Sequence, residues 1–266
     1  MPDSKIMEAT LVVDIGNTNI VCAVFDRGEK IASSRILSIP PLSKEEYLSR
    51  LGILFPEYPF VLFKYVVVAS VVPSITKVWQ EISLDYPGQC FHFITGLSTL
   101  GLKYNITNRA IVGADLVANA FAAWKGYSGS SLVVDLGTAT TIQLVTEQGL
   151  YAGVVIAPGM KTAASQLIQK AAQLEEFSLV APDEVIGNNT IDALRSGIVL
   201  GHALMIQSFI AKISEEYPHY APYTVILTGG LASTIAPLCP SDYILDSDLT
   251  INGLFLAACH LAGESE

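Results

Sequence analysis

The chain has 266 residues, of which 51% are hydrophobic and 15% are charged, and its formal net charge is −10 at pH 7. This length favours two domains, each large enough to bury a core. The acidic balance argues against a nucleic-acid partner, which requires a basic surface. Any phosphate ligand would therefore be held by backbone N–H groups and a metal ion.

The N-terminal residues lack the layout of a signal peptide. The longest apolar stretch, residues 61–72, contains Lys64 and is too short to span a bilayer. The four cysteines are Cys22, Cys90, Cys239 and Cys259. They are widely spaced and form no C-x-x-C pair, so we expect buried thiols in a reducing compartment, with neither a zinc site nor a disulfide framework. These features predict a cytoplasmic protein with no membrane partner.

The first motif with chemical content lies in residues 10–27. The apolar run Leu11–Val13 predicts a buried strand, and it is followed by Asp14 and by the turn Gly16-Asn17-Thr18. Glycine lets a ligand approach the backbone closely, and successive N–H groups can form an anion nest. Asp14 is placed to hold a hydrated metal ion. An ordinary hairpin with an Asx turn would show the same pattern.

A second copy of this pattern begins at Leu132. The sequence Leu-Val-Val-Asp135-Leu-Gly137-Thr138 repeats the apolar run, the aspartate and the glycine of the first copy. We interpret the repeat as an internal duplication, with a phosphate-type hairpin at the start of each of two similar domains. Two such turns facing each other across a cleft could hold one polyphosphate from both sides.

The remaining first half alternates between helix and strand patterns, which predicts α/β domains. Ser43 and Glu46 form a capping box before a helix over residues 43–55. Apolar runs at 65–73 and 91–94 predict buried strands. After Gly113 and Ala114, the apolar spacing is helical and places Asp115 in or just before the first turn. Capping of that helix is the alternative role for Asp115.

The second half predicts a strand over 153–159, a helix over 160–177 and a long helix over 190–217. Gly197 and Gly201 would share one face of the long helix and allow close helix packing, including at a dimer interface. A strand ending at Thr228 enters the turn Gly229-Gly230, a third candidate ligand loop. None of the four histidines has metal-ligand spacing. Neither a Walker A motif nor G-x-G-x-x-G occurs, so P-loop kinases and dinucleotide-binding domains are unsupported.

Taken together, these motifs resemble the type III pantothenate kinase family, which belongs to the superfamily of acetate and sugar kinases, heat-shock 70 proteins and actin. The similarity runs from about Leu11 to about Leu261. The matching segments are Asp14–Thr18, Gly113–Asp115 with Asn119-Ala120, Asp135–Ala139, Gly153 through Gly159, Ile186–Thr190 and Thr228–Ala232.

The resemblance implies two duplicated actin-like (ribonuclease H-like) α/β domains, residues 1–114 and 115–266. Each would contain a mixed five-stranded sheet with helices, and ATP would lie in the cleft between them. The implied reaction is ATP-dependent phosphorylation of pantothenate to 4'-phosphopantothenate, the first step of coenzyme A biosynthesis. The resemblance also implies a homodimer in which the partner subunit completes each pantothenate site.

The resemblance implies roles for individual residues as well. Asp14, Ile15, Gly16, Asn17 and Thr18 would bind the ATP phosphates, with Mg2+ at Asp14. Asp135 would coordinate a monovalent cation, K+ or NH4+. Gly137 and Thr138 would contact ATP, and Thr228, Gly229 and Gly230 would lie near the adenosine. Gly113 and Ala114 would line the pantothenate site, and Asp115 would be the general base toward the primary hydroxyl.

The chain departs from the family on the acceptor side. The family usually has Arg where this chain has Leu116, Tyr where it has Ile106, Thr where it has Ala171, and often Asp where it has Gln143. On a strand, Tyr104 would face the same side as residue 106 and can substitute for the missing Tyr. We therefore place Tyr104, Leu116 and Ala171 in the acceptor site. Two alternatives stay open: a kinase for another small hydroxylated acceptor, and a non-catalytic ATP-binding homologue.

Overall fold

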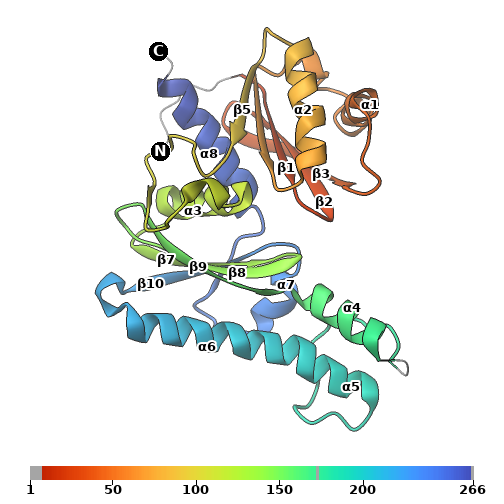
Figure 1. Cartoon of the computed structure of the whole chain (residues 1–266), viewed down its shortest axis with the longest axis vertical. Coiled ribbons are helices and arrows are strands. Elements are labelled where there is room, and N and C mark those ends of the chain that lie inside the picture. Colours follow the sequence, from red (N-terminus) through yellow and green to blue (C-terminus); the bar gives the residue numbers. More distant parts are fainter. Residues whose placement is uncertain (1–7, 172–173, 265–266) are drawn as a thin grey trace. The chain divides into compact units, whose positions relative to one another are not determined.

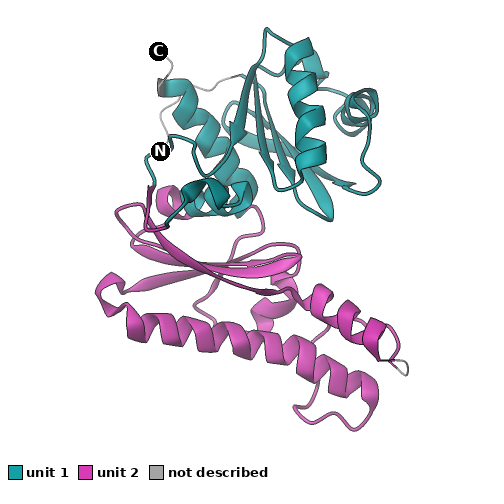
Figure 2. Ribbon diagram, in the orientation of Figure 1, with its two compact units in different colours: residues 1–102, 107–122, 249–266 teal, residues 103–106, 123–248 magenta. Residues whose placement is uncertain are grey.

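A computed structural model of the chain describes residues 8–171 and 174–264. The chain forms two compact units (Figure 2). Unit 1 contains residues 1–102, 107–122 and 249–266, and unit 2 contains residues 103–106 and 123–248.

Unit 1 is built on a mixed five-stranded sheet, with two helices on one face and the C-terminal helix on the other (Figure 1). Its strands are β1 (Thr10–Ile15), β2 (Asn19–Asp26), β3 (Glu29–Leu37), β4 (Tyr65–Ser70) and β5 (Cys90–Ile94), in the order β3-β2-β1-β4-β5. Strand β1 is antiparallel to β2 and parallel to β4, and β5 is parallel to β4. The helices are α1 (Lys44–Leu54), α2 (Pro73–Asp85), most of α3 (Ala114–Gly126) and α8 (Leu249–Glu264), with short turns at Phe60–Leu62 and Arg109–Ile111.

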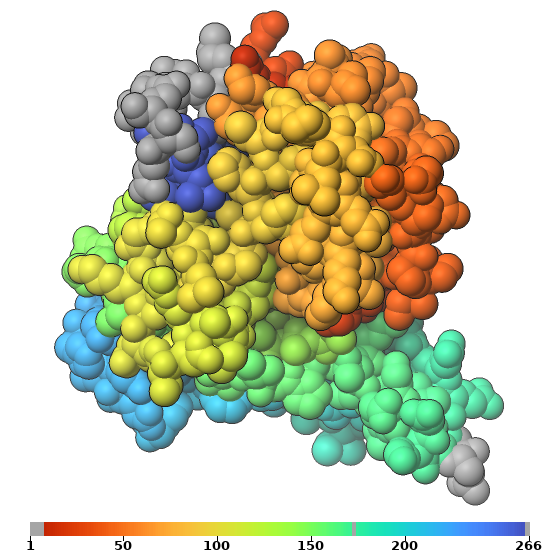
Figure 3. Space-filling model, turned by 45° about the horizontal axis from the view of Figure 1, so that its top comes forward, coloured from red at the N-terminus to blue at the C-terminus, as the bar shows by residue number. Residues whose placement is uncertain are grey.

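The predicted capping box of α1 is confirmed. Ser43 Oγ accepts a hydrogen bond from the Glu46 N–H, and Glu46 Oε2 accepts one from the Ser43 N–H at 2.7 Å. Tyr47 and Leu51 of α1 then pack with Trp79 of α2 in the core under the sheet. By contrast, residues 107–111 are exposed, and the yellow region of Figure 3 shows this part of the chain at the surface.

Unit 2 repeats the sheet of unit 1. Its strands are β7 (Ser130–Leu136), β8 (Ala139–Val145), β9 (Leu150–Pro158), β10 (Tyr223–Thr228), β11 (Ile244–Leu245) and the two-residue β6 (Lys103–Tyr104). The order β9-β8-β7-β10-β11 matches β3-β2-β1-β4-β5, which supports the predicted duplication. The sheet has a sixth strand where five were expected, because Asn105 N–H and Lys103 N–H bond to Tyr151 O and Gly149 O and attach β6 beside β9.

The helices of unit 2 cover one face of this sheet (Figure 1). They are α4 (Met160–Lys170), α5 (Thr190–Arg195), a π-helical turn (Ser196–Leu200), α6 (Gly201–Glu216) and α7 (Ala232–Ile235), with short turns at Pro218–Tyr220 and Ala236–Leu238. Val199, Ala203, Ile206 and Ile210 contribute to the core. The stretch Thr190–Glu216 is long and apolar enough to cross a membrane. This is weak evidence for a membrane span, because core helices of soluble proteins can have the same length and composition.

Several expectations need correction. The units do not coincide with residues 1–114 and 115–266, because α8 returns to the first sheet, where the Phe255 ring stacks on Phe25 at 4.2 Å. The helix expected over 160–177 ends at Lys170. Apart from its chain neighbours and the backbone of its own helix, no atom of the described residues lies within 4 Å of a Cβ added at Gly197, so the expected close packing is not made there within this chain. Packing of this face at a dimer interface stays a prediction.

The expectation of four buried thiols is also wrong. All four cysteines are free, but only Cys22 is fully buried, whereas Cys90 is exposed and Cys239 and Cys259 are intermediate. Cys90 opens strand β5 at the edge of the sheet of unit 1, where fewer neighbours cover it.

Candidate active site

The first predicted loop is a tight hairpin between β1 and β2 in unit 1. Gly16 N–H donates to Asn19 O at 3.0 Å, and Ser38 Oγ donates to Gly16 O at 2.6 Å. Asn17 and Thr18 are exposed at the tip. Ile15 is fully buried in the core, so its side chain is not available to a ligand. The hairpin therefore offers backbone groups and short polar side chains, as the sequence predicted.

Val71 connects this hairpin to the start of α3 within unit 1. Its N–H donates to Ile15 O at 3.0 Å, and its Cγ1 lies 3.6 Å from where a Cβ on Gly113 would be. A Cβ on Gly113 would also lie 2.4 Å from Asp115 Oδ1. A side chain at position 113 would therefore displace the Asp115 carboxylate from its present position over the backbone.

Asp115 lies in the first turn of α3, where the sequence placed it. Its Oδ1 accepts a hydrogen bond from the Leu116 N–H at 2.8 Å, one of the N–H groups of the first turn that lack a partner within the helix. Asp115 is the second residue of α3, so it does not take the N-cap position that the alternative role required. Burial raises the pKa of Asp115 above its usual value, while hydrogen bonds from the Leu116 and Asp115 N–H groups oppose that change. A partly buried carboxylate with a raised pKa is a suitable general base.

Asn119, the next residue of the same motif, has a structural role. It is fully buried, and its Oδ1 accepts a hydrogen bond from Thr250 Oγ1 of α8 at 2.7 Å. A Cβ on Gly253 would lie 2.1 Å from Ala118 O, which shows how closely α8 approaches α3. The helix that carries Asp115 is therefore held by the C-terminal helix, a dependence that sequence reasoning missed.

The second and third predicted loops come together in unit 2. Strands β7 and β10 are parallel, and their carboxyl ends place Asp135 beside Thr228. Gly229 has φ = +91°, and a Cβ there would lie 2.4 Å from Asp135 Oδ1. Gly137 N–H donates to Ala139 O at 3.0 Å across a turn one residue shorter than that of Gly16 in unit 1. The structure thus assembles Asp135, Gly137 and Gly229 at one end of the sheet, where ligands bind in α/β folds.

The start of α4 packs on the same hairpin. Gly159 N–H and Thr162 Oγ1 both donate to Thr138 O, at 3.1 and 2.6 Å. A Cβ on Gly159 would lie 2.3 Å from Gly137 O. Gly159 is therefore needed for this close approach. The Pro-Gly pair before the helix was a visible signal, whereas nothing in the sequence singled out Thr162.

The predicted acceptor residues are divided between the units. Leu116, Ala114 and Gly113 belong to unit 1, while Tyr104 and Ala171 belong to unit 2. Tyr104 is partly buried, with its ring centroid 5.8 Å from that of Tyr151. Ala171 is the C-cap of α4, and the adjoining motif residues 172–173 lie outside the described residues.

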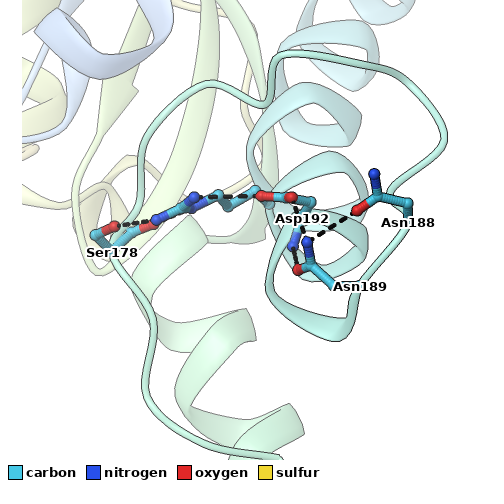
Figure 4. Close-up of polar contacts among 5 residues, drawn as sticks. Ser178, Asn188, Asn189 and Asp192 are labelled. Atoms are coloured by element: carbon cyan, nitrogen blue, oxygen red, sulfur yellow. Dashed lines mark hydrogen bonds and ion pairs between the residues drawn. The ribbon is translucent and has the colours of Figure 1, made fainter.

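The motif at residues 186–190 stabilises a loop (Figure 4). Asn189 Oδ1 accepts a hydrogen bond from the Asp192 N–H at 3.0 Å and caps α5, and Asn189 Nδ2 donates to Asn188 Oδ1. Arg195 bonds to Asp192 and, at 2.8 Å, to Ser178 Oγ. These contacts account for Asn188 and Asn189 of the motif without a ligand.

A surface cavity of about 580 Å³ lies at the other end of the sheet in unit 1. Ala9, Lys64 and Gln89, which line it, precede β1, β4 and β5. The cavity is therefore at the amino ends of these parallel strands, and it contains none of the predicted site residues. Ligand sites of α/β sheets lie at the carboxyl ends, where Asp14 is found, so we do not assign the reaction to this cavity.

The described residues contain no group of three or more His, Cys, Asp or Glu side chains that could hold a metal ion. Asp14 is a single carboxylate at its hairpin. That fits Mg2+, which usually takes one or two carboxylates and fills its other positions with water and substrate phosphates.

Comparison with known proteins identifies the same family that the sequence motifs resemble. Residues 10–212 match the family model described as type III pantothenate kinase. A curated protein of that name from Thermomicrobium roseum is 39% identical over 246 residues, covering 92% of this chain and 94% of the relative. One from Thermus thermophilus is 37% identical, covering 92% and 96%.

Solved structures support the fold. An activator of 2-hydroxyisocaproyl-CoA dehydratase from Clostridium difficile with bound ADPNP has a TM-score of 0.61 and 15% identity, covering 97% of this chain and 96% of its own. A ROK hexokinase from Thermus thermophilus has a TM-score of 0.52 and 14% identity, covering 97% and 100%. At these identities the likeness concerns the fold alone, and it confirms the expected actin-like class.

Proposed function

This chain belongs to the type III pantothenate kinase family, and we propose that the loops and the aspartate described above carry out the phosphorylation of pantothenate by ATP. The observation that carries the assignment of residues is the pair of similar hairpins, whose turns differ by one residue. Each follows an aspartate, and each closes through a glycine N–H bond of 3.0 Å.

The proposed ATP-side residues are Asp14 and Gly16–Thr18 in unit 1 and Asp135, Gly137, Thr138, Thr228, Gly229 and Gly230 in unit 2. Phosphoryl transfer depends mainly on positioning and charge neutralisation. Backbone N–H groups at the hairpins can supply both in an acidic protein. Mg2+ at Asp14 and a monovalent cation at Asp135 would neutralise phosphate charge. Burial of the Ile15 side chain leaves only its backbone for a role in binding ATP.

Asp115 is the proposed general base. Its carboxylate would accept the proton of the primary hydroxyl of pantothenate as the oxygen attacks the γ-phosphorus. Gly113 and Ala114 would leave room for the acceptor, and Tyr104 and Leu116 would shape its pocket. Ala171 cannot supply the hydroxyl of the Thr usual in the family.

We also propose that the protein is a cytoplasmic homodimer. Large apolar side chains are exposed along α5, α6 and the loop before them: Val185, Ile186, Ile191, Leu204 and Phe209. We propose these side chains as the interface, since contiguous exposed apolar surface often marks one.

The test is pantothenate-dependent release of ADP by the purified protein with Mg-ATP and K+. We expect turnover by the wild type and a loss of roughly 10²- to 10⁴-fold in kcat for Asp115→Asn, because general-base catalysis is worth about that much. ATP binding by the variant, measured by calorimetry, should be unchanged.

Turnover of another alcohol in preference to pantothenate would favour the alternative acceptor. ATP binding without turnover of any acceptor, and no difference between the wild type and Asp115→Asn, would favour a non-catalytic homologue.

A further inference from the structure

The two faces of the sheet in unit 2 differ in polarity. Leu132, Val134 and Ile142 face the apolar core under α6. The residues between them point to the opposite face, since side chains alternate along a strand. The register pairs Asp135 with Thr141 and Val133 with Gln143. The face away from the core therefore carries a carboxylate, a hydroxyl and an amide on adjacent strands.

Gln143 is the most unusual residue on this face. It is fully buried, yet neither its Nε2 nor its Oε1 has a hydrogen-bond partner among the described residues. Thr141 Oγ1, two residues nearer the hairpin, is likewise buried without a partner there. Burying an amide with neither atom bonded is unfavourable, and a leucine of similar size would avoid that penalty. The fold alone gives no reason for glutamine at this position.

The register also places Gln143 between two predicted parts of the site. Asp135 and the hairpin lie in one direction along the strand. In the other direction Val145 pairs with Tyr151, and Tyr151 pairs with Tyr104 of β6, so both tyrosines lie on the face of Gln143. Gln143 thus lies between the proposed cation ligand and the proposed acceptor residue Tyr104.

We propose that Gln143 is a positioning residue for the acceptor and that it binds the neutral polar groups of that molecule. This inference rests on the proposed function. Between its primary hydroxyl and its carboxylate, pantothenate carries a secondary hydroxyl and an amide. The side-chain amide of Gln143 can donate to one of these groups and accept from another, whereas an aspartate at this position could only accept.

The experiment compares Gln143→Leu with Thr140→Val. Thr140 is on the same strand but faces the core, where its Oγ1 lies 2.8 Å from His202 Nε2. Gln143→Leu should raise the KM for pantothenate roughly 10- to 100-fold, as expected when a site loses hydrogen bonds to its substrate. Its KM for ATP should stay the same, and the Tm of the free protein should be unchanged or higher.

Thr140→Val should do the opposite: it should lower the Tm and leave the KM for pantothenate unchanged. A pantothenate analogue that lacks the secondary hydroxyl adds a second measurement. If Gln143 binds that group, the wild type should turn over the analogue less efficiently than pantothenate. Gln143→Leu should then reduce turnover of the analogue less than it reduces turnover of pantothenate. Gln143→Met serves as a second variant if Gln143→Leu does not fold.

Unchanged kinetics in both Gln143 variants, or a lower Tm without a change in KM, would overturn the inference while leaving the proposed function intact. If the wild type does not phosphorylate pantothenate at all, the proposed function is wrong and this inference is wrong with it.

Discussion

At the scale of the residue, two properties of the Asp115 carboxylate oppose each other. It is partly buried, which raises its pKa, and it must be ionised to accept a proton. The pKa of Asp115 is higher in the folded protein than in the unfolded chain. At pH values between these two pKa values, the folded protein therefore binds more protons than the unfolded chain. The contribution of Asp115 to stability is therefore present at low pH and is lost as the pH rises through the folded-state pKa.

Asp115→Asn should remove this pH dependence. Below roughly pH 3, where the carboxyl is protonated in both states, the variant and the wild type should be about equally stable. At about pH 7 the variant should be the more stable of the two. Urea unfolding at both pH values measures this difference. The Asn side chain can still accept from the Leu116 N–H, so this hydrogen bond is preserved. A variant less stable at both pH values would show that the hydrogen bond to the carboxylate outweighs the cost of burying its charge.

Individual residues were predictable where a motif determines them. Asp14, Asp115 and Asp135 were identified from the sequence, and the structure places each at a hairpin or in a first helical turn. The roles of Gly159 and Asn119 depend on contacts with residues at least 20 positions away in the chain. No local pattern contains that information.

At the scale of the element, the contact between α3 and α8 determines where Asp115 is held. An added Cβ at Gly253 would overlap Ala118 O at 2.1 Å, and that oxygen belongs to the backbone of α3. Gly253→Ala should therefore destabilise unit 1 by about 1–3 kcal/mol, as overpacking commonly does.

Gly263→Ala is the matched control. Gly263 lies in the same helix, and apart from that helix's own backbone and the chain neighbours no atom of the described residues lies within 4 Å of a Cβ added there. It should be neutral or slightly stabilising, since alanine favours a helix over glycine. Thermal unfolding of both variants makes the comparison. An equal Tm for the two proteins would mean that α8 can move away from α3 without loss.

Most elements were predictable because local signals mark them, as at the capping box of α1. The end of α4 was missed because the apolar pattern continues to Leu174 with no glycine or proline to stop the helix. Strand β6 was missed because two residues carry no periodicity.

At the scale of the whole molecule, the duplication was visible as two copies of one motif, and the matching strand orders agree with it. The return of α8 to unit 1 was not visible, because the apolar pattern of a helix does not identify the sheet it covers. The proposed dimer is a different case, since it depends on surface that one chain leaves exposed.

Leu204 of α6 is 51% exposed and is the side chain with which to test that surface. Leu204→Glu should shift the mass measured by light scattering from dimer to monomer, because a charge buried in an apolar interface is strongly unfavourable. Leu84→Glu, at a site 79% exposed on α2, is the control and should leave the mass unchanged. If the partner subunit completes the acceptor site, Leu204→Glu should also raise the KM for pantothenate and leave ATP binding intact. A wild-type monomer with full activity would rule out both the dimer and the shared site.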